Sequence, residues 1–69
     1  MKISARNQLR GTVVEIVKGA TTAHVRIDTG TAVITASITN TSVDELGLKV
    51  GGTAYAVIKA SDVMVGVDD

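Results

Sequence analysis

Apolar and polar residues alternate along much of the chain, with the period of two that is typical of β-strands. The clearest case is the segment from 22 to 28, where the apolar residues Ala23, Val25 and Ile27 alternate with polar ones. Successive side chains of a strand point to opposite faces. This pattern therefore predicts a strand that buries one face and exposes the other.

Four further segments have strand character and are separated by turn signals. We expect these strands over Gly11–Lys18, Ala32–Thr39, Thr53–Ile58 and Met64–Val67. In the second of them, Ile34, Ala36 and Ile38 are expected to face inward. The loop before it contains Gly30, which can take the positive φ that a hairpin loop requires.

One short helix is expected between the third and fourth strands. Ser42 and Glu45 have the spacing of a capping box, in which the Ser42 hydroxyl accepts the N3 amide and Glu45 reaches back. Gly47 can end the helix in a left-handed conformation. We expect Leu46 and Leu48 to attach this helix to the core.

This order of elements predicts an all-β fold, a five-stranded OB-fold barrel with one short helix between strands 3 and 4. A β-sandwich of similar strand count is the alternative, but the position of the helix and the length of 69 residues favour the compact barrel. No linker or change of composition divides the chain, so residues 1–69 are expected to form a single domain. Met1 starts that domain, and we expect a free-standing protein.

The size of the chain and its lack of cysteine indicate self-association. A chain of 69 residues buries only roughly 60% of the surface that its unfolded form exposes. Disulfides, metals or oligomerisation usually support such small domains. Cysteine is absent and the single His24 cannot form a cluster, so we expect no metal ligands and instead a homo-oligomer.

The charge balance and the terminal sequence exclude other partners. Seven basic residues balance seven acidic ones, and Tyr55 is the only aromatic residue. Nucleic-acid modules usually carry a basic surface and aromatic stacking platforms, so we expect no nucleic-acid partner. The N-terminus lacks the apolar segment of a signal peptide, and no apolar run approaches the ~20 residues of a membrane span. We therefore expect a cytoplasmic protein with no membrane partner.

Two short polar segments offer concentrated binding chemistry. Ser4–Asn7 and Lys59–Asp62 each place one cation beside a hydroxyl and several backbone amides, next to a strand-like stretch. Arginine presents five N–H groups in a planar fork, and successive amides can hold an anion. Ser61 or a neighbour can also begin a helical turn with free amides. Taken singly, each segment is equally typical of an exposed strand end.

Taken together, the two segments match a known pattern. The chain resembles the molbindin family of small molybdate-binding proteins. Members of that family are built from one transport-associated OB (TOBE) domain. The resemblance rests on SARNQLRGTV at 4–13, VDELGLKVG at 43–51 and AVIKASDVM at 56–64. These motifs, in this order, span almost the whole chain.

The resemblance implies a protein that binds molybdate, and similarly tungstate, for storage, buffering or homeostasis, and that needs no cofactor. It implies a homohexamer, a trimer of dimers, with the anions held at subunit interfaces. The main oxyanion site takes three residues from one subunit and three from a neighbour: Ser4, Ala5 and Arg6, with Lys59, Ala60 and Ser61.

Further site residues are implied less directly. Asn7 lies in the first motif, but its role can equally be to hold the loop. Sites near the symmetry axis of the hexamer are expected on a turn rich in amides and hydroxyls, formed by Gly19, Ala20, Thr21 and Thr22.

No catalytic arrangement is evident, so we expect no enzyme activity. Glu15, Asp28 and Asp44 are scattered, and no serine has a histidine base suggested by the sequence. Neither a P-loop nor a dinucleotide fingerprint is present. Two alternatives to oxyanion binding remain open, an OB-fold nucleic-acid-binding module and a purely structural oligomerisation module.

Overall fold

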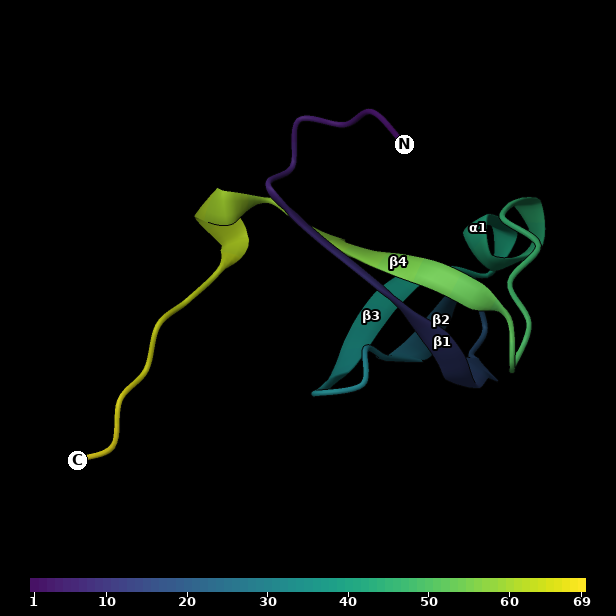
Figure 1. Ribbon diagram of the computed structural model, residues 1–69. Helices are drawn as coiled ribbons and strands as arrows, with labels where there is room; N and C mark the ends of the chain where they lie inside the picture. Colours follow the sequence, from purple (N-terminus) through teal and green to yellow (C-terminus); the bar gives the residue numbers. More distant parts are fainter.

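The computed structural model describes residues 1–69 and combines one curled antiparallel sheet with a short helix (Figure 1). Its elements in chain order are β1 (Asn7–Lys18), β2 (Thr22–Asp28), β3 (Val33–Thr39), α1 (Asn40–Glu45), β4 (Thr53–Ile58) and the 3₁₀ helix η1 (Ala60–Asp62). The strands are ordered β3-β2-β1-β4. The all-β class and the place of the helix between the third and fourth strands are confirmed. Neither helix has the length and apolar character that crossing a membrane requires.

The hydrophobic core is small and joins three strands to α1. Only six of the 69 residues are buried, and all six are apolar: Val13, Ala23, Val25, Ile27, Val43 and Ala56. The inward face predicted for β2 is confirmed, because its three apolar residues belong to this set. Ile34 and Ile38 of β3 are half-buried against the core, as expected. One copy of the chain therefore encloses little apolar surface.

A β-bulge interrupts β1. The pairing of β1 with β2 shifts register between Val13 and Glu15. As a result Val13 and Ile16, three positions apart rather than two, both pack in the core. A bulge places two residues opposite one and so breaks the period of two, which explains why the sequence of β1 does not alternate strictly.

β1 begins four residues earlier than the sequence pattern predicted. Asn7 to Gly11 pair with β4, and the ladder ends with Asn7 opposite Ile58. The residues before Gly11 are mostly polar and exposed, so they carry no apolar periodicity. Backbone pairing alone places them in the strand.

The fifth strand predicted over Met64–Val67 is wrong for a single copy of the chain. Residues 63–69, here called the C-terminal arm, pair with no strand and leave the sheet after η1 (Figure 1). Met64, Val65 and Val67 are 93%, 90% and 89% exposed. A strand is stabilised by the neighbour that shares its hydrogen bonds, and in one copy the arm has no such neighbour.

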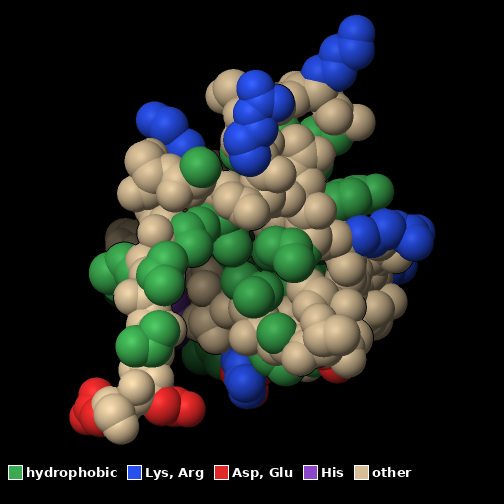
Figure 2. All heavy atoms as spheres, turned by 60° about the vertical axis from the view of Figure 1, so that its left-hand side comes forward, with side chains coloured by type: hydrophobic (Ala, Val, Ile, Leu, Met, Phe, Trp, Pro, Cys, Tyr) green, Lys and Arg blue, Asp and Glu red, His purple; other side chains and the backbone are tan.

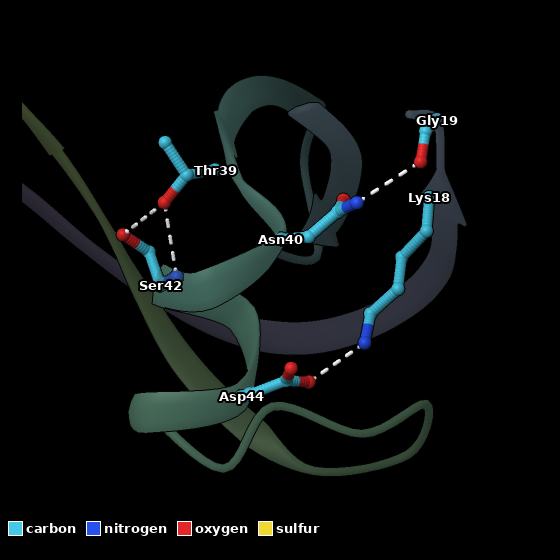
Figure 3. Close-up of polar contacts among 6 residues, drawn as sticks. All are labelled: Lys18, Gly19, Thr39, Asn40, Ser42 and Asp44. Atoms are coloured by element: carbon cyan, nitrogen blue, oxygen red, sulfur yellow. Dashed lines mark hydrogen bonds and ion pairs between the residues drawn. The ribbon is translucent and has the colours of Figure 1, made fainter. Parts of the chain in front are cut away.

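α1 also begins earlier than predicted. Its N-cap is Thr39, whose hydroxyl oxygen accepts a hydrogen bond from the Ser42 amide at 3.0 Å (Figure 3). The predicted capping box is therefore wrong, because Ser42 lies at N3 and Glu45 is the last helical residue. Thr39 and Ser42 are three residues apart and both carry a hydroxyl, so either can satisfy the free amides of a first turn.

The turn glycines behave largely as predicted. Gly30 and Gly47 have φ values of 95° and 63°, in the left-handed region. Leu48 packs against the core after the helix. Leu46, however, is 68% exposed, so the expectation that it attaches the helix to the core is wrong for one copy of the chain.

Gly11 of β1 lies close to the end of β2, and its replacement tests this approach. A Cβ added at Gly11 would meet the carbonyl oxygen of Asp28 and lie 2.8 Å from Cγ2 of Ile27. Gly11→Ala is expected to lower the free energy of unfolding by about 1–3 kcal/mol, as overpacking does. Denaturant unfolding followed by circular dichroism measures the change.

Gly66→Ala is the matched control, because a Cβ there meets nothing within 4 Å. It should leave the unfolding midpoint unchanged. A Gly11→Ala midpoint equal to that of the control would contradict the close approach of the two strands.

Candidate functional site

The two polar segments meet at one end of the β1–β4 ladder. Its last pair is Asn7 opposite Ile58. Arg6 directly precedes β1 and Lys59 directly follows β4, so the two residues flank the same end of the ladder. Beyond this point the N-terminal segment and η1 diverge (Figure 1). Residues more than fifty positions apart thus become neighbours within one chain.

Two side-chain amides hold this end of the ladder. The Asn7 Nδ2 donates to the carbonyl oxygen of Ile58 at 3.1 Å, in a part-buried hydrogen bond. The Gln8 Nε2 donates to the carbonyl oxygen of Ala5 at 3.0 Å. Asn7 therefore has the loop-holding role that its sequence position allowed. Gln8 has a similar role that no feature of the sequence indicated.

Both segments carry hydrogen-bond donors that have no partner within the chain. Five backbone amides donate no hydrogen bond: those of Ser4, Ala5, Arg6, Ala60 and Ser61. Four side chains of the segments that can donate are also unpaired: Ser4, Arg6, Lys59 and Ser61. One end of the ladder is therefore rich in free N–H and O–H groups.

η1 shapes the second segment. Lys59 is its N-cap and forms no side-chain capping bond. Two backbone hydrogen bonds close this turn. The Asp62 amide donates to the Lys59 carbonyl at 2.9 Å, and the Val63 amide donates to the Ala60 carbonyl at 3.3 Å. The first amides of a helical turn have no intrahelical acceptor. The predicted helical turn around Ser61 is thus confirmed.

The cations of this site are free of ion pairs. Arg6 and Lys59 are exposed, and the only ion pair of the chain joins Lys18 Nζ to Asp44 Oδ1 at 2.6 Å, away from the site (Figure 3). Asp62 is the single carboxylate of the two segments, which leaves one excess positive charge. Lysine and arginine side chains project freely from the edges of the face in Figure 2.

The turn Gly19–Thr22 lies elsewhere. It follows the far end of β1, a strand of 12 residues that spans about 36 Å when extended. Asn40 holds it, since Nδ2 donates to the Gly19 carbonyl at 2.9 Å (Figure 3) and the Asn40 amide donates to the Thr21 carbonyl at 2.8 Å. The amides of Ala20 and Thr21 donate no hydrogen bond. Within one chain this turn therefore does not join the two polar segments.

The bond from Asn7 to Ile58 is expected to stabilise the end of the ladder. Asn7→Ala removes it and should lower the free energy of unfolding by about 0.5–1.5 kcal/mol, the usual net value of one hydrogen bond. Thermal and denaturant unfolding measure this loss. Gln8→Ala removes an exposed hydrogen bond and should cost less. An equal loss in both variants would contradict a special role for Asn7.

Comparison with known proteins places the chain in a family. The TOBE domain model matches residues 3–65. A probable molybdenum-pterin-binding protein of Haemophilus influenzae is 54% identical over 69 residues, which cover 99% of this chain and 100% of that protein. A molybdate-binding protein from Sporomusa ovata has a similar structure, with a TM-score of 0.91 and 42% identity over 97% of this chain and 100% of that one.

A second solved structure is the cytoplasmic molybdate-binding protein ModG with molybdate bound. It has a TM-score of 0.93 and 48% identity, over 99% of this chain and 49% of that one. These matches cover almost the whole chain in both sequence and structure, and they confirm the resemblance to molbindins. The chain belongs to the TOBE domain family.

Proposed function

We propose that this chain binds molybdate, and similarly tungstate, as an intact oxyanion. The observation that carries the proposal is the set of unpaired donors at the end of the β1–β4 ladder. The similarity to proteins described as molybdate-binding supports it. The main site takes its donors from six residues: Ser4, Ala5, Arg6, Lys59, Ala60 and Ser61.

The donors match the chemistry of the anion. Molybdate is a tetrahedral dianion, and the cations of Arg6 and Lys59 are equal in number to its two charges. Hydrogen bonds to charged groups are shorter than neutral ones and roughly twice as strong. The backbone amides and the hydroxyls of Ser4 and Ser61 can then satisfy the remaining oxygen lone pairs without adding charge. Exclusion of water strengthens each of these bonds.

Selectivity among anions follows from size and protonation. Molybdate, tungstate and sulfate are all tetrahedral dianions, so the dimensions of the cavity must separate the larger two from sulfate. Phosphate is partly protonated near neutral pH and needs an acceptor in the site. Donors are the main groups of the two segments, which disfavours a protonated phosphate.

The anion is held between copies of the chain, in a homohexamer built as a trimer of dimers. The small core supports self-association, because only six residues are buried in one copy. The divergence of the two segments supports a shared site (Figure 1). Ser4–Arg6 of one copy can face Lys59–Ser61 of another. Further anions near the symmetry axis are assigned to the turn Gly19–Thr22, with its free amides at Ala20 and Thr21.

The role of the protein is binding rather than catalysis. Residues 1–69 act as a single domain that stores or buffers the oxyanion in the cytoplasm and uses no cofactor. The names of its relatives describe binding and not a reaction. No nucleic acid or membrane takes part in this function.

Loss of either cation is expected to weaken molybdate binding. Arg6→Ala and Lys59→Ala each remove a charge-assisted contact worth about 1.5–3 kcal/mol, which corresponds to a dissociation constant about 10- to 150-fold higher. Isothermal titration calorimetry with sodium molybdate measures the change.

Matched controls are Arg26→Ala and Lys49→Ala, which remove exposed cations outside the site. Both should bind molybdate with the affinity of the unmodified chain. If the unmodified chain releases no heat, molybdate binding is wrong. If it binds but all four variants bind equally well, the assignment of the site is wrong.

A further inference from the structure

Residues 1–6 form only one hydrogen bond with the rest of the chain. In it, the Gln8 Nε2 donates to the carbonyl oxygen of Ala5 at 3.0 Å. No other backbone or side-chain hydrogen bond involves residues 1–6, and neither does the ion pair of the chain. Ala5 is half-buried, whereas its neighbours Ser4 and Arg6 are exposed. Gln8 therefore holds the segment that carries the first half of the proposed oxyanion site.

This bond fixes the direction of one particular peptide group. The Ala5 carbonyl and the Arg6 N–H belong to the same peptide, which is planar and trans, so the two groups point in opposite directions. A carbonyl directed at the Gln8 side chain therefore turns the Arg6 N–H away from that side chain. The Arg6 amide donates no hydrogen bond within the chain, so this N–H is available to a ligand.

No regular element orders this peptide. The chain bends at Ser4 and at Arg6, and β1 begins only at Asn7. Figure 1 shows the N-terminal segment turning sharply out of the line of β1. Each residue of such a segment keeps two soft dihedral angles, and ordering them at the moment of binding lowers affinity. A donor that orders the peptide before the anion arrives therefore raises affinity.

Asn7 makes a related bond in a different setting. Its Nδ2 donates to the Ile58 carbonyl, which shares a peptide group with the Lys59 N–H. That bond is part-buried and spans 51 positions, whereas the bond from Gln8 to Ala5 is exposed and spans three. The Asn7 bond thus ties two strands together and contributes to stability. The Gln8 bond ties no two elements together, and its effect is on the direction of one N–H group.

We propose that Gln8 is a positioning residue of the oxyanion site, which orders the Ala5–Arg6 peptide so that the Arg6 N–H is directed at the anion. This role rests on the proposed function, because it concerns the affinity for molybdate. Gln8 acts through the peptide group and not through a contact of its own with the anion. Arg6 then supplies two kinds of donor, a guanidinium on a flexible side chain and a backbone N–H whose direction Gln8 sets.

Gln8→Met tests this role, because it keeps the length of the side chain and removes its donor. Isothermal titration calorimetry with sodium molybdate should give a dissociation constant about 2- to 10-fold higher, the range expected for the loss of one hydrogen bond. The free energy of unfolding should fall by less than in Asn7→Ala, because the lost bond is exposed. Lower affinity with nearly unchanged stability is the expected result.

Thr29→Val is the matched control. The Thr29 Oγ1 donates to the Ala32 carbonyl at 3.1 Å, in a bond that is likewise exposed and spans three positions. It lies in the loop between β2 and β3, outside the proposed site. Thr29→Val should bind molybdate with the affinity of the unmodified chain.

The order of the Arg6 amide separates positioning from direct contact. In the anion-free chain, ¹⁵N relaxation should give a lower order parameter for this amide in Gln8→Met than in the unmodified chain. The value should move from that of rigid backbone, about 0.85, toward that of flexible segments, below about 0.6. Weaker binding without lower order at Arg6 would indicate direct contact by Gln8 and would overturn the positioning role.

A combined variant tests which donor of Arg6 is affected. Arg6→Ala removes the guanidinium and keeps the N–H, so adding Gln8→Met should weaken the residual binding by the same factor as in the unmodified chain. Loss of that effect would overturn the role assigned to the N–H. An unmodified chain that releases no heat would overturn the proposed function and this role together. A chain that binds molybdate while Gln8→Met and Thr29→Val bind equally well would overturn the positioning role alone.

Discussion

The antiparallel ladder between β1 and β4 is the interaction on which the rest of the structure depends. It joins the first strand to the last, and its final pair is Asn7 opposite Ile58. The part-buried hydrogen bond from Asn7 to Ile58 holds that end. Arg6 and Lys59 leave the sheet there as neighbours, which places the two candidate anion-binding segments in one location. In the resulting strand order, β3-β2-β1-β4, the outer edges of β3 and β4 are unpaired.

The second constraint is size. A core of six buried residues leaves a large share of the apolar side chains of this chain in contact with water. Burial of apolar surface stabilises proteins by roughly 25 cal/mol per Å², so a second copy that covers exposed apolar side chains contributes where the single chain cannot. In our account, association covers apolar surface and builds the oxyanion site at once. Stability and function then depend on the same contacts.

Local patterns in the sequence predicted the parts of the fold that local physics determines. β2 was predicted because its apolar residues alternate strictly, and Gly30 and Gly47 because a left-handed turn favours glycine. The start of β1 was missed, because residues 7–10 carry no apolar pattern and enter the strand only through pairing with β4. The capping box was placed at Ser42 because local spacing does not distinguish it from Thr39. The bulge after Val13 likewise depends on the partner strand.

The sequence predicted which residues form the candidate site, but not how they lie relative to one another within one chain. Arg6 and Lys59 were singled out by their neighbours in sequence, yet their adjacency within one chain depends on the long-range register of two strands. The holding role of Asn40 depends on the Gly19 carbonyl, 21 positions away, which only the fold brings near. The hydrogen bond of Gln8 reaches the Ala5 carbonyl three positions away and is local. The arm was predicted as a strand from its valines, and in one copy it has the composition of a strand without the partner that a strand requires.

Native mass spectrometry of the unmodified chain, with and without molybdate, tests the central claim most directly. The claim is that association and oxyanion binding share one set of contacts. It predicts assemblies of this chain, with the hexamer dominant, whose masses increase by whole numbers of molybdate ions. A monomer that binds molybdate as well as any assembly does, or a monomer that binds none, would contradict it.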